Sequence, residues 1–308
     1  MTTASPDTST PSTTRTILVT DSGLGGLSVF NDIANRLAKG SPWQRVKLVY
    51  VNAWPAPERG YNYFATMERS VRVFDSALNA MAAFDPDVIL IACNTLSVIY
   101  PRTPFYNASN IPVEGIVDHG VQMIYESLMA KPGSKAVILG TPTTIAARSH
   151  ETALVRLGIA RDRIINIECT NLAGWIERKP FSETVNEMIR RFVRETAAAL
   201  GDFSGHVVAA LCCTHFGYRQ ELFEKAFADL VRATVTILNP NVRMARQVFE
   251  AGDPSRSLPA RIDMHIVSKA VWTKEQLAAY VKLLPDISTA TRNALTGYTL
   301  DPELFSVE

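Results

Sequence analysis

Short apolar runs alternate with amphipathic segments along most of the 308-residue chain. Residues 16–20, 46–51 and 135–140 have the length and the β-branched content of buried strands. Between such runs, residues 66–83 and 182–200 carry apolar side chains at the three- and four-residue spacing of amphipathic helices. This alternation predicts an α/β fold with mainly parallel sheets.

Two of the predicted strands end in a cysteine followed by small polar residues. Residues 87–92 lead into Cys93-Asn94-Thr95, and residues 206–211 lead into Cys212-Cys213-Thr214-His215. Ligands of parallel α/β sheets bind beyond the carboxyl ends of the strands. We therefore expect Cys93 and Cys213 to face each other across one active site. Cys212 alternates to the other side of the extended chain, and we expect it in the core.

The chemistry of these cysteines has three interpretations. A thiol beside a protonated histidine or at a helix N-terminus has a depressed pKa and reacts as the thiolate, and His215 is two residues from Cys213. A free cysteine can also be a small buried hydrophobic residue. A zinc site is the third, but Cys212, Cys213 and His215 are too compressed in sequence and no CxxC pair occurs. We expect no metal.

A glycine-rich turn, Asp21-Ser22-Gly23-Leu24-Gly25-Gly26, follows the first predicted strand. It has neither the lysine of a Walker loop nor the spacing of a dinucleotide-binding loop. Backbone N–H groups of such a turn, together with the N-terminus of the next helix, can bind an anion such as a carboxylate. The alternative is a tight turn between strand and helix in which Asp21 caps the helix.

Charge and composition argue against nucleic-acid-binding, membrane and disulfide-rich secreted proteins. The net charge of +1 gives no field that would attract nucleic acid or an anionic membrane. No apolar run is long enough to span a bilayer, and the N-terminus lacks the features of a secretory signal. Four cysteines in a chain of this length do not form a disulfide framework. We expect a cytoplasmic enzyme with reduced thiols and a disordered Ser/Thr/Pro-rich tail at residues 1–14.

Three motifs of the chain resemble the glutamate racemase branch of the aspartate/glutamate racemase superfamily. Residues 17–29 are similar to the opening DSGxGGL(S/T)V of that branch, Ala92-Cys93-Asn94-Thr95 is similar to ACNT, and Leu211-Cys212-Cys213-Thr214-His215-Phe216 is similar to LGCTHY. The motifs occur in the order of the family, and the resemblance covers nearly all of residues 15–240.

The resemblance implies two pseudo-symmetric α/β domains with mainly parallel sheets and the active site in the cleft between them. It also implies a chain that leaves the first domain, builds the second and returns. On this basis we expect residues 15–115 and 217–308 to form the first, discontinuous domain, and residues 116–216 to form the second.

The resemblance further implies a cofactor-independent racemase that acts on glutamate or a related acidic amino acid. One thiolate removes the α-proton and the other thiol protonates the opposite face, because inversion needs an acid and a base on opposite sides. The catalytic residues carried over are Cys93 with Asp21, and Cys213 with His215 and Glu177. The substrate-binding residues carried over are Ser22, Asn94, Thr95, Thr141, Thr144 and Thr214. The implied partner is a small carboxylate, and a homodimer is left open.

The chain departs from the family pattern at several positions. No Pro-Tyr-Gly loop, which helps to hold the substrate carboxylate in the family, can be placed in residues 52–61. Cys212 replaces the glycine before the second cysteine, and His150 stands near the position of a family tyrosine. These departures leave two alternatives open: a superfamily decarboxylase or isomerase that works through a cysteine-stabilised carbanion, and a non-catalytic carboxylate-binding protein.

Overall fold

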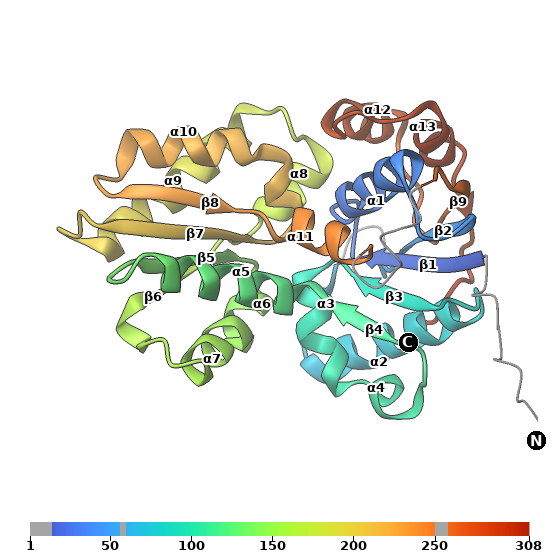
Figure 1. Cartoon of the computed structure of the whole chain (residues 1–308), viewed down its shortest axis with the longest axis horizontal. Helices are drawn as coiled ribbons and strands as arrows, with labels where there is room; N and C mark the ends of the chain where they lie inside the picture. The colour runs from blue at the N-terminus through green and yellow to red at the C-terminus, as the bar shows by residue number, and fades with distance from the viewer. Residues whose placement is uncertain (1–13, 56–59, 250–257, 308) are drawn as a thin grey trace, which may run out of the picture.

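The computed structural model describes residues 14–55, 60–249 and 258–307, whose strands form two separate sheets (Figure 1). Every pairing between named strands is parallel, and helices connect the strands, so the predicted α/β class is confirmed. The expected tail lies outside the described residues except for Thr14, with which the first strand begins.

The larger sheet has six strands in the order β10-β9-β2-β1-β3-β4. Their bounds are β1 Thr14–Asp21, β2 Arg45–Asn52, β3 Val88–Ile91, β4 Val113–Gly115, β9 Arg261–Ser268 and β10 Thr299–Leu300. Alternate residues of β1 point to opposite faces, so Ile17 and Val19 join one hydrophobic cluster while Leu18 joins another. Phe30 packs in the first cluster and Phe74 in the second, which shows that helices cover both faces of the sheet.

The helical segments between these strands begin where their sequences provide caps and apolar stripes. Thr66, for example, accepts a hydrogen bond from the backbone of Arg69 and so caps α2. The segments are α1 Leu27–Lys39, η1 Tyr61–Tyr63, α2 Met67–Ala82, α3 Asn94–Ile99, η2 Tyr100–Arg102, α4 Pro104–Ala108, α12 Lys274–Leu283 and α13 Thr289–Thr296.

The smaller sheet has four strands in the order β6-β5-β7-β8. Their bounds are β5 Lys135–Gly140, β6 Ile164–Glu168, β7 His206–Cys212 and β8 Thr234–Leu238. The helical segments of this part are α5 Ile116–Ala130, α6 Pro142–Ala147, α7 Ser149–Arg156, η3 Arg161–Arg163, α8 Leu172–Arg178, α9 Glu183–Leu200, η4 Thr214–Arg219, α10 Gln220–Leu230 and α11 Pro240–Gln247. Cys212 is fully buried in this part, which confirms its expected place in the core.

The strand order corrects one expected boundary. We expected residues 217–308 to belong with the first sheet, but β8 pairs with β7 along its whole length and α10 packs against α9. The pairing gives β7 a hydrogen-bonded neighbour on each side, β5 and β8, and the residues of β7 after His206 are buried. Residues 217–238 therefore lie with the four-stranded sheet. We propose that the chain returns from the second domain to the first after β8 rather than after residue 216.

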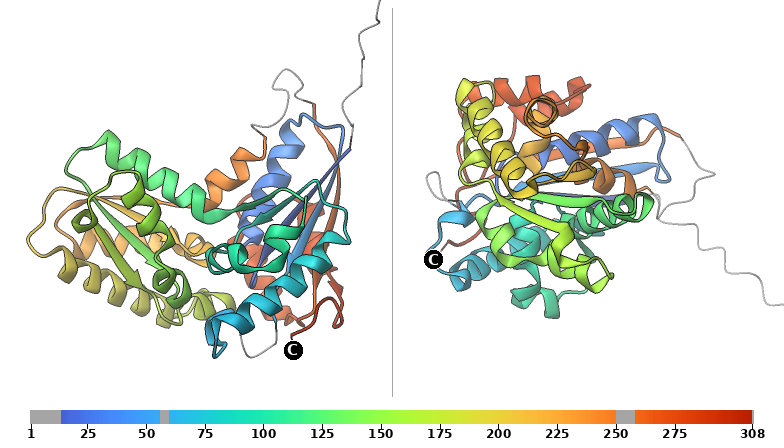
Figure 2. Two further views of the ribbon diagram at one scale, coloured as in Figure 1. Left: turned by 90° about the horizontal axis from the view of Figure 1, so that it is seen from below. Right: turned by 90° about the vertical axis from the view of Figure 1, so that its left-hand side faces the viewer.

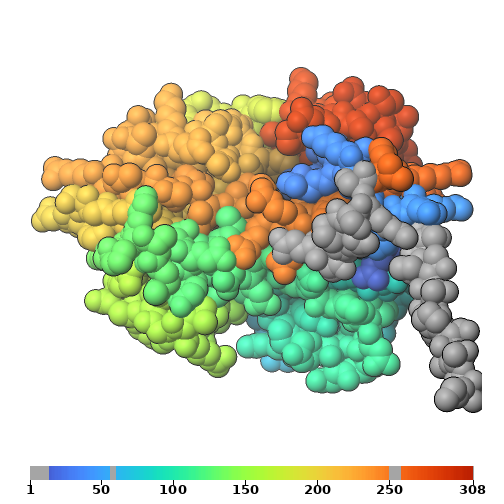
Figure 3. Space-filling view, viewed as in Figure 1, coloured from blue at the N-terminus to red at the C-terminus, as the bar shows by residue number. Residues whose placement is uncertain are grey.

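Helices α5 and α11 form the junction between the two sheets. Helix α11 packs against α5 on one side and against α1 on the other. The two sheets lie side by side in two lobes (Figures 1 and 2), and in the space-filling view α11 fills part of the junction. Figure 3 also shows the C-terminal helices lying against α1.

Candidate active site

A cavity of about 550 Å³ lies where the carboxyl ends of strands from both sheets meet. Cys93, which follows β3, and Cys213, which follows β7, both line it. The other predicted site residues that line it are Asp21, Ser22, Asn94, Thr95, Thr141, Glu177, Thr214 and His215. The structure therefore brings the predicted side chains of both halves together at one place.

Cys93 occupies the N-cap of α3, where its sulfur accepts a hydrogen bond from the Leu96 backbone N–H at 3.5 Å. Ser22 Oγ lies 3.2 Å from the same sulfur, within hydrogen-bond distance. Burial and, to a smaller extent, the negative charge of Asp21 raise the pKa of the Cys93 thiol, the hydrogen bond with Ser22 opposes them, and the resulting pKa is about 12. Cys93 is therefore a neutral thiol in this arrangement.

Asp21 is completely buried at the end of β1. Its Oδ2 accepts a 2.7 Å hydrogen bond from Thr214 Oγ1, while its Oδ1 has no hydrogen-bond partner among the described residues. Burial raises the pKa of Asp21 to about 6, although the charge of His215 and the hydrogen bond from Thr214 both lower it. Asp21 is thus mainly ionised at neutral pH and changes its protonation state near pH 6.

His215 connects Cys213 to a carboxylate. Its Nδ1 lies 3.9 Å from Cys213 Sγ, and its Nε2 forms a short hydrogen bond with Oε2 of Glu177. Burial lowers the pKa of His215, but its contacts with Cys213 and Glu177 outweigh burial and hold the pKa well above its ordinary value. A protonated His215 can donate to the sulfur and to the carboxylate at the same time.

Glu177 receives hydrogen bonds from three distant parts of the chain on one oxygen. Besides His215, the backbone N–H of Leu24 and the hydroxyl of Tyr280 each donate to Oε2 over 3.0 Å. Leu24 belongs to the glycine-rich turn and Tyr280 to α12. Of the two interpretations of this turn, one was that its N–H groups bind an anion such as a carboxylate; the carboxylate that the Leu24 N–H binds here is the protein's own.

Gly25 explains why this turn contains so much glycine. A Cβ atom at Gly25 would lie 2.3 Å from Thr214 Oγ1 and 2.6 Å from His215 Nδ1, which is too close for any side chain. Glycine therefore lets the backbone after β1 approach the turn after Cys213.

A row of hydroxyl groups joins the two sides of the cavity. Thr95 Oγ1 lies 2.9 Å from Thr141 Oγ1, which lies 3.0 Å from Thr144 Oγ1. Thr144 does not line the cavity, unlike the other predicted residues, and its place behind Thr141 fits a supporting role. The amide of Asn94 is buried, and neither its nitrogen nor its oxygen has a partner among the described residues.

Sequence reasoning missed the residues that cover one side of the cavity. Gly60, Tyr61, Asn62 and Tyr63 line it, at and directly after the end of residues 52–61, where no family loop could be placed. Tyr63 donates a 2.8 Å hydrogen bond to Oδ1 of Asn171, and Asn62 Oδ1 accepts one of 3.3 Å from the Thr143 backbone, so this segment bridges to the other half. Its position in a loop after a strand end is the signal that could have found it.

Cys169 and His150 are two more buried titratable groups. Cys169 lines the cavity and is buried, and burial raises the pKa of its thiol well above the ordinary value. His150, which stands near the position of a family tyrosine, is 2% exposed and packs near Gly120 of α5. Burial lowers the pKa of His150 to about 4, and the residue does not line the cavity.

The described residues contain neither a candidate metal site nor a candidate membrane span. In residues 14–55, 60–249 and 258–307, no His, Cys, Asp and Glu side chains gather in a group of three or more that could hold a metal ion. None of the helices in this part of the chain has both the length and the apolar character needed to cross a bilayer.

The sequence model of the Asp/Glu/Hydantoin racemase family matches residues 17–242. The chain belongs to this family. The predicted family resemblance is therefore confirmed, and the match includes both strand ends that carry the thiols. It ends before α12, so Tyr280 lies outside it.

Similar proteins point to one branch of the family. A glutamate racemase from Vibrio cholerae is 28% identical over 280 residues, which is 89% of this chain and 94% of the relative. One from Brucella anthropi is 26% identical over 253 residues, covering 79% and 81%. These relatives support racemase activity, as expected, and favour neither the decarboxylase or isomerase alternative nor the binding-protein alternative.

Solved structures show the same fold. Glutamate racemase isoform RacE1 from Bacillus anthracis has a TM-score of 0.68 at 18% identity and covers 93% of this chain and 96% of its own. A glutamate racemase from Francisella tularensis, in complex with D-glutamate, has a TM-score of 0.69 at 14% identity and covers 96% and 98%. At these identities the likeness concerns the fold.

Proposed function

We propose that this protein is a cofactor-independent racemase of an acidic amino acid, with Cys93 and Cys213 as its two acid–base groups. The observation that carries the proposal is that both thiols line one cavity, although each comes from a strand end of a different sheet. The relatives named above are glutamate racemases, and one solved structure of the same fold holds D-glutamate, which supports an acidic substrate.

In the proposed reaction, Cys213 and Cys93 act on opposite faces of the α-carbon. Cys213 as thiolate, with protonated His215 beside it, takes the α-proton: the C–H bond breaks and an S–H bond forms. Cys93 is a neutral thiol and gives its proton to the other face, so that a new C–H bond forms and Cys93 is left as thiolate. The other enantiomer reacts through the same steps in reverse.

The carbanion spreads its charge onto the substrate carboxylate, which needs preorganised donors. Two buried groups that line the cavity can donate a hydrogen bond and have no partner among the described residues: the Asn94 amide and the Tyr61 hydroxyl. The hydroxyl of Thr214 already donates to Asp21, and Ser22 is paired with Cys93. We therefore assign the first carboxylate contacts to Asn94 and Tyr61, with Thr95 and Thr141 next to them.

The side-chain carboxylate of an acidic amino acid could bind a cationic side chain in the same cavity. Arg178, at the end of α8, lines the cavity and forms no ion pair with any residue that the structure describes. An unpaired guanidinium binds a carboxylate through two parallel hydrogen bonds. This favours an acidic amino acid over a neutral one. The need for reduced thiols also supports a reducing compartment, and we propose the cytoplasm.

The test is to incubate the protein in heavy water with single enantiomers of glutamate, aspartate, glutamine and alanine. We expect α-deuterium incorporation and inversion with an acidic substrate only. Cys93→Ser and Cys213→Ser should each lower turnover by about a thousandfold, because serine is too weak an acid and base. Absence of both exchange and inversion across the panel contradicts the proposal, and retention of turnover by either variant contradicts the two-thiol mechanism.

A further inference from the structure

The C-terminal part of the chain supplies a side chain to the candidate active site. Helix α12 lies outside residues 17–242, to which the family match is confined, and Figure 1 shows it close to α1 and α8. Tyr280 of α12 is completely buried, and its hydroxyl donates to Glu177 Oε2 over 3.0 Å. A helix distant in sequence thus contacts the carboxylate that binds His215.

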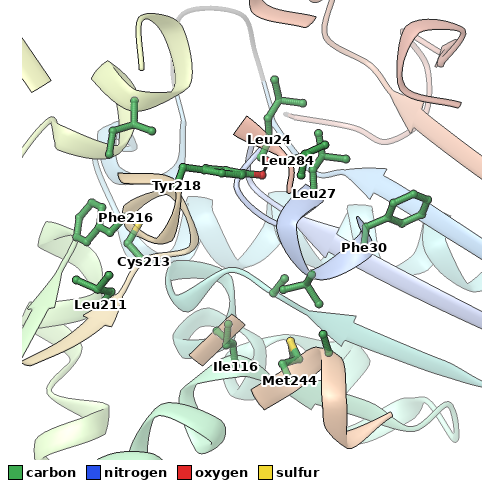
Figure 4. Packing of buried hydrophobic residues seen from close by; sticks show 14 of the residues in the cluster. Leu24, Leu27, Phe30, Ile116, Leu211, Cys213, Phe216, Tyr218, Met244 and Leu284 are labelled. Carbon is green, nitrogen blue, oxygen red and sulfur yellow. Dashed lines mark hydrogen bonds between the residues drawn. The ribbon is translucent and has the colours of Figure 1, made fainter. Parts of the chain in front are cut away.

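The ring of Tyr280 has a packing role that can be separated from the hydroxyl. Its ring meets that of Tyr218 edge to face, with centroids 5.3 Å apart and an interplanar angle of 87°. Tyr218 in turn donates its hydroxyl to the Leu24 carbonyl over 3.0 Å, and Figure 4 shows its oxygen pointing toward Leu24 and Leu284. Phenylalanine at position 280 would keep the ring contact and would lose only the bond to Glu177.

The hydroxyl of Tyr280 limits where Glu177 can lie. A carboxylate bound by His215 alone could rotate about that single hydrogen bond. In this structure Leu24, Tyr280 and His215 all donate to Oε2 of Glu177, and together they fix the position of that oxygen. The position of Glu177 sets the orientation of the imidazole, and therefore the position of Nδ1 relative to Cys213 Sγ. Hydrogen bonds to a charged acceptor are also stronger than those to a neutral one.

We propose that Tyr280 is a positioning residue, which acts through Glu177 and His215 to hold the imidazole against Cys213. The inference rests on the proposed function, in which Cys213 is one of the two proton-transfer groups. By this proposal, α12 contributes a side chain to the active site on the side of Cys213 and not on the side of Cys93.

The test compares Tyr280→Phe with Tyr298→Phe. Tyr298 is a matched control, because it lies in the same C-terminal part and its hydroxyl is hydrogen-bonded, to the backbone N–H of Trp272. We expect Tyr280→Phe to lower kcat/KM about tenfold, the usual scale for losing one hydrogen bond to a charged group, and Tyr298→Phe to stay within about twofold of wild type.

A second readout does not need turnover. Iodoacetamide labelling at neutral pH, followed by mass spectrometry of the peptides, gives separate rates for Cys93 and Cys213. Tyr280→Phe should slow labelling of Cys213 about threefold or more and change that of Cys93 by less than about 1.5-fold, because His215 contacts Cys213 directly and reaches Cys93 only through Asp21. Unchanged labelling of both thiols overturns the proposal, and so does an equal change in both, which would mean general loosening.

A double-mutant cycle shows whether Tyr280 acts through Glu177. In a Glu177→Gln background, the further change Tyr280→Phe should have less than about a twofold effect on Cys213 labelling. A full effect in that background overturns the proposed route. If the wild-type protein racemises no amino acid and the labelling results are as expected, the positioning role of Tyr280 stands and the proposed function fails.

Discussion

Thr214 Oγ1 donates a hydrogen bond to Oδ2 of Asp21 over 2.7 Å, and this bond connects the end of β1 in the larger sheet with the turn after β7 in the smaller one. Asp21 raises the pKa of Cys93 through its charge, while Thr214 directly follows Cys213. The environments of the two proton-transfer groups are therefore linked through one buried carboxylate.

Thr214→Val should move the acid limb of the pH profile upward. The hydrogen bond from Thr214 lowers the pKa of Asp21, so its loss raises that pKa above the present value of about 6. In the pH dependence of kcat/KM, the limb near pH 6 should then lie at higher pH in Thr214→Val. Thr214→Ser keeps the hydroxyl and should leave the limb in place. Identical limbs in wild type and Thr214→Val would disprove the link.

Asp21→Asn should stabilise the fold at neutral pH while it lowers activity. The folded pKa of Asp21 is raised from its ordinary 3.8 to about 6, so the stability associated with protonated Asp21 is present below pH 4 and is lost as pH rises through 6. Ionised Asp21 then costs the wild type up to about 3 kcal/mol at pH 7. In urea unfolding, the advantage of Asp21→Asn should shrink as pH falls from 7 to 4. An advantage that does not depend on pH would contradict the raised pKa.

Ser22→Ala and Asp21→Asn should change the reactivity of Cys93 in opposite directions. The hydrogen bond with Ser22 lowers the pKa of Cys93, whereas the charge of Asp21 raises it. Because the thiolate is the reactive form, iodoacetamide labelling of Cys93 near pH 9 should be slower in Ser22→Ala and faster in Asp21→Asn. Each variant serves as the control for the other, and a change in the same direction in both would count against this electrostatic account.

Tyr61→Phe should weaken substrate binding, whereas Tyr63→Phe should not. Both residues belong to η1, but the Tyr61 hydroxyl is buried beside the cavity without a partner among the described residues, whereas Tyr63 is 56% exposed and binds Asn171. The ring of Tyr61 packs edge to face against Phe64 and Phe74, and phenylalanine keeps these contacts. We expect KM for the acidic substrate to rise about tenfold in Tyr61→Phe only. Equal KM values for the two variants would remove Tyr61 from the site.

Local sequence was sufficient to predict the two thiol-bearing strand ends. Each follows a run of apolar residues that is buried on both sides, and the position beyond such a run is fixed by the parallel sheet. Cys93 and Cys213 could therefore be placed together before any coordinates were known. Ser22, Thr141 and Thr214 follow strands in the same way, and they line the same cavity.

The rest depends on contacts that local sequence does not encode. Glu177 and Tyr280 are 103 residues apart, and nothing near either residue indicates that they meet. The pairing of β8 with β7 also cannot be predicted from local sequence, because an apolar strand of five residues can add to either sheet. Tyr61 belongs to a loop without periodicity, where only the packing of its ring fixes the position of the hydroxyl.

The place of β9 in the larger sheet has a consequence for the order in which the chain folds. Strand β2 pairs with β1 on one side and with β9 on the other, although more than 200 residues separate β2 from β9. Two strands so far apart in sequence lose much chain entropy when the loop between them closes, and the favourable contacts form only afterwards. Their pairing therefore forms late. During synthesis, the smaller sheet is complete while β2 is still an open edge that can pair with another chain. Until β9 emerges, the unfinished larger sheet is thus the part of the nascent chain most exposed to aggregation.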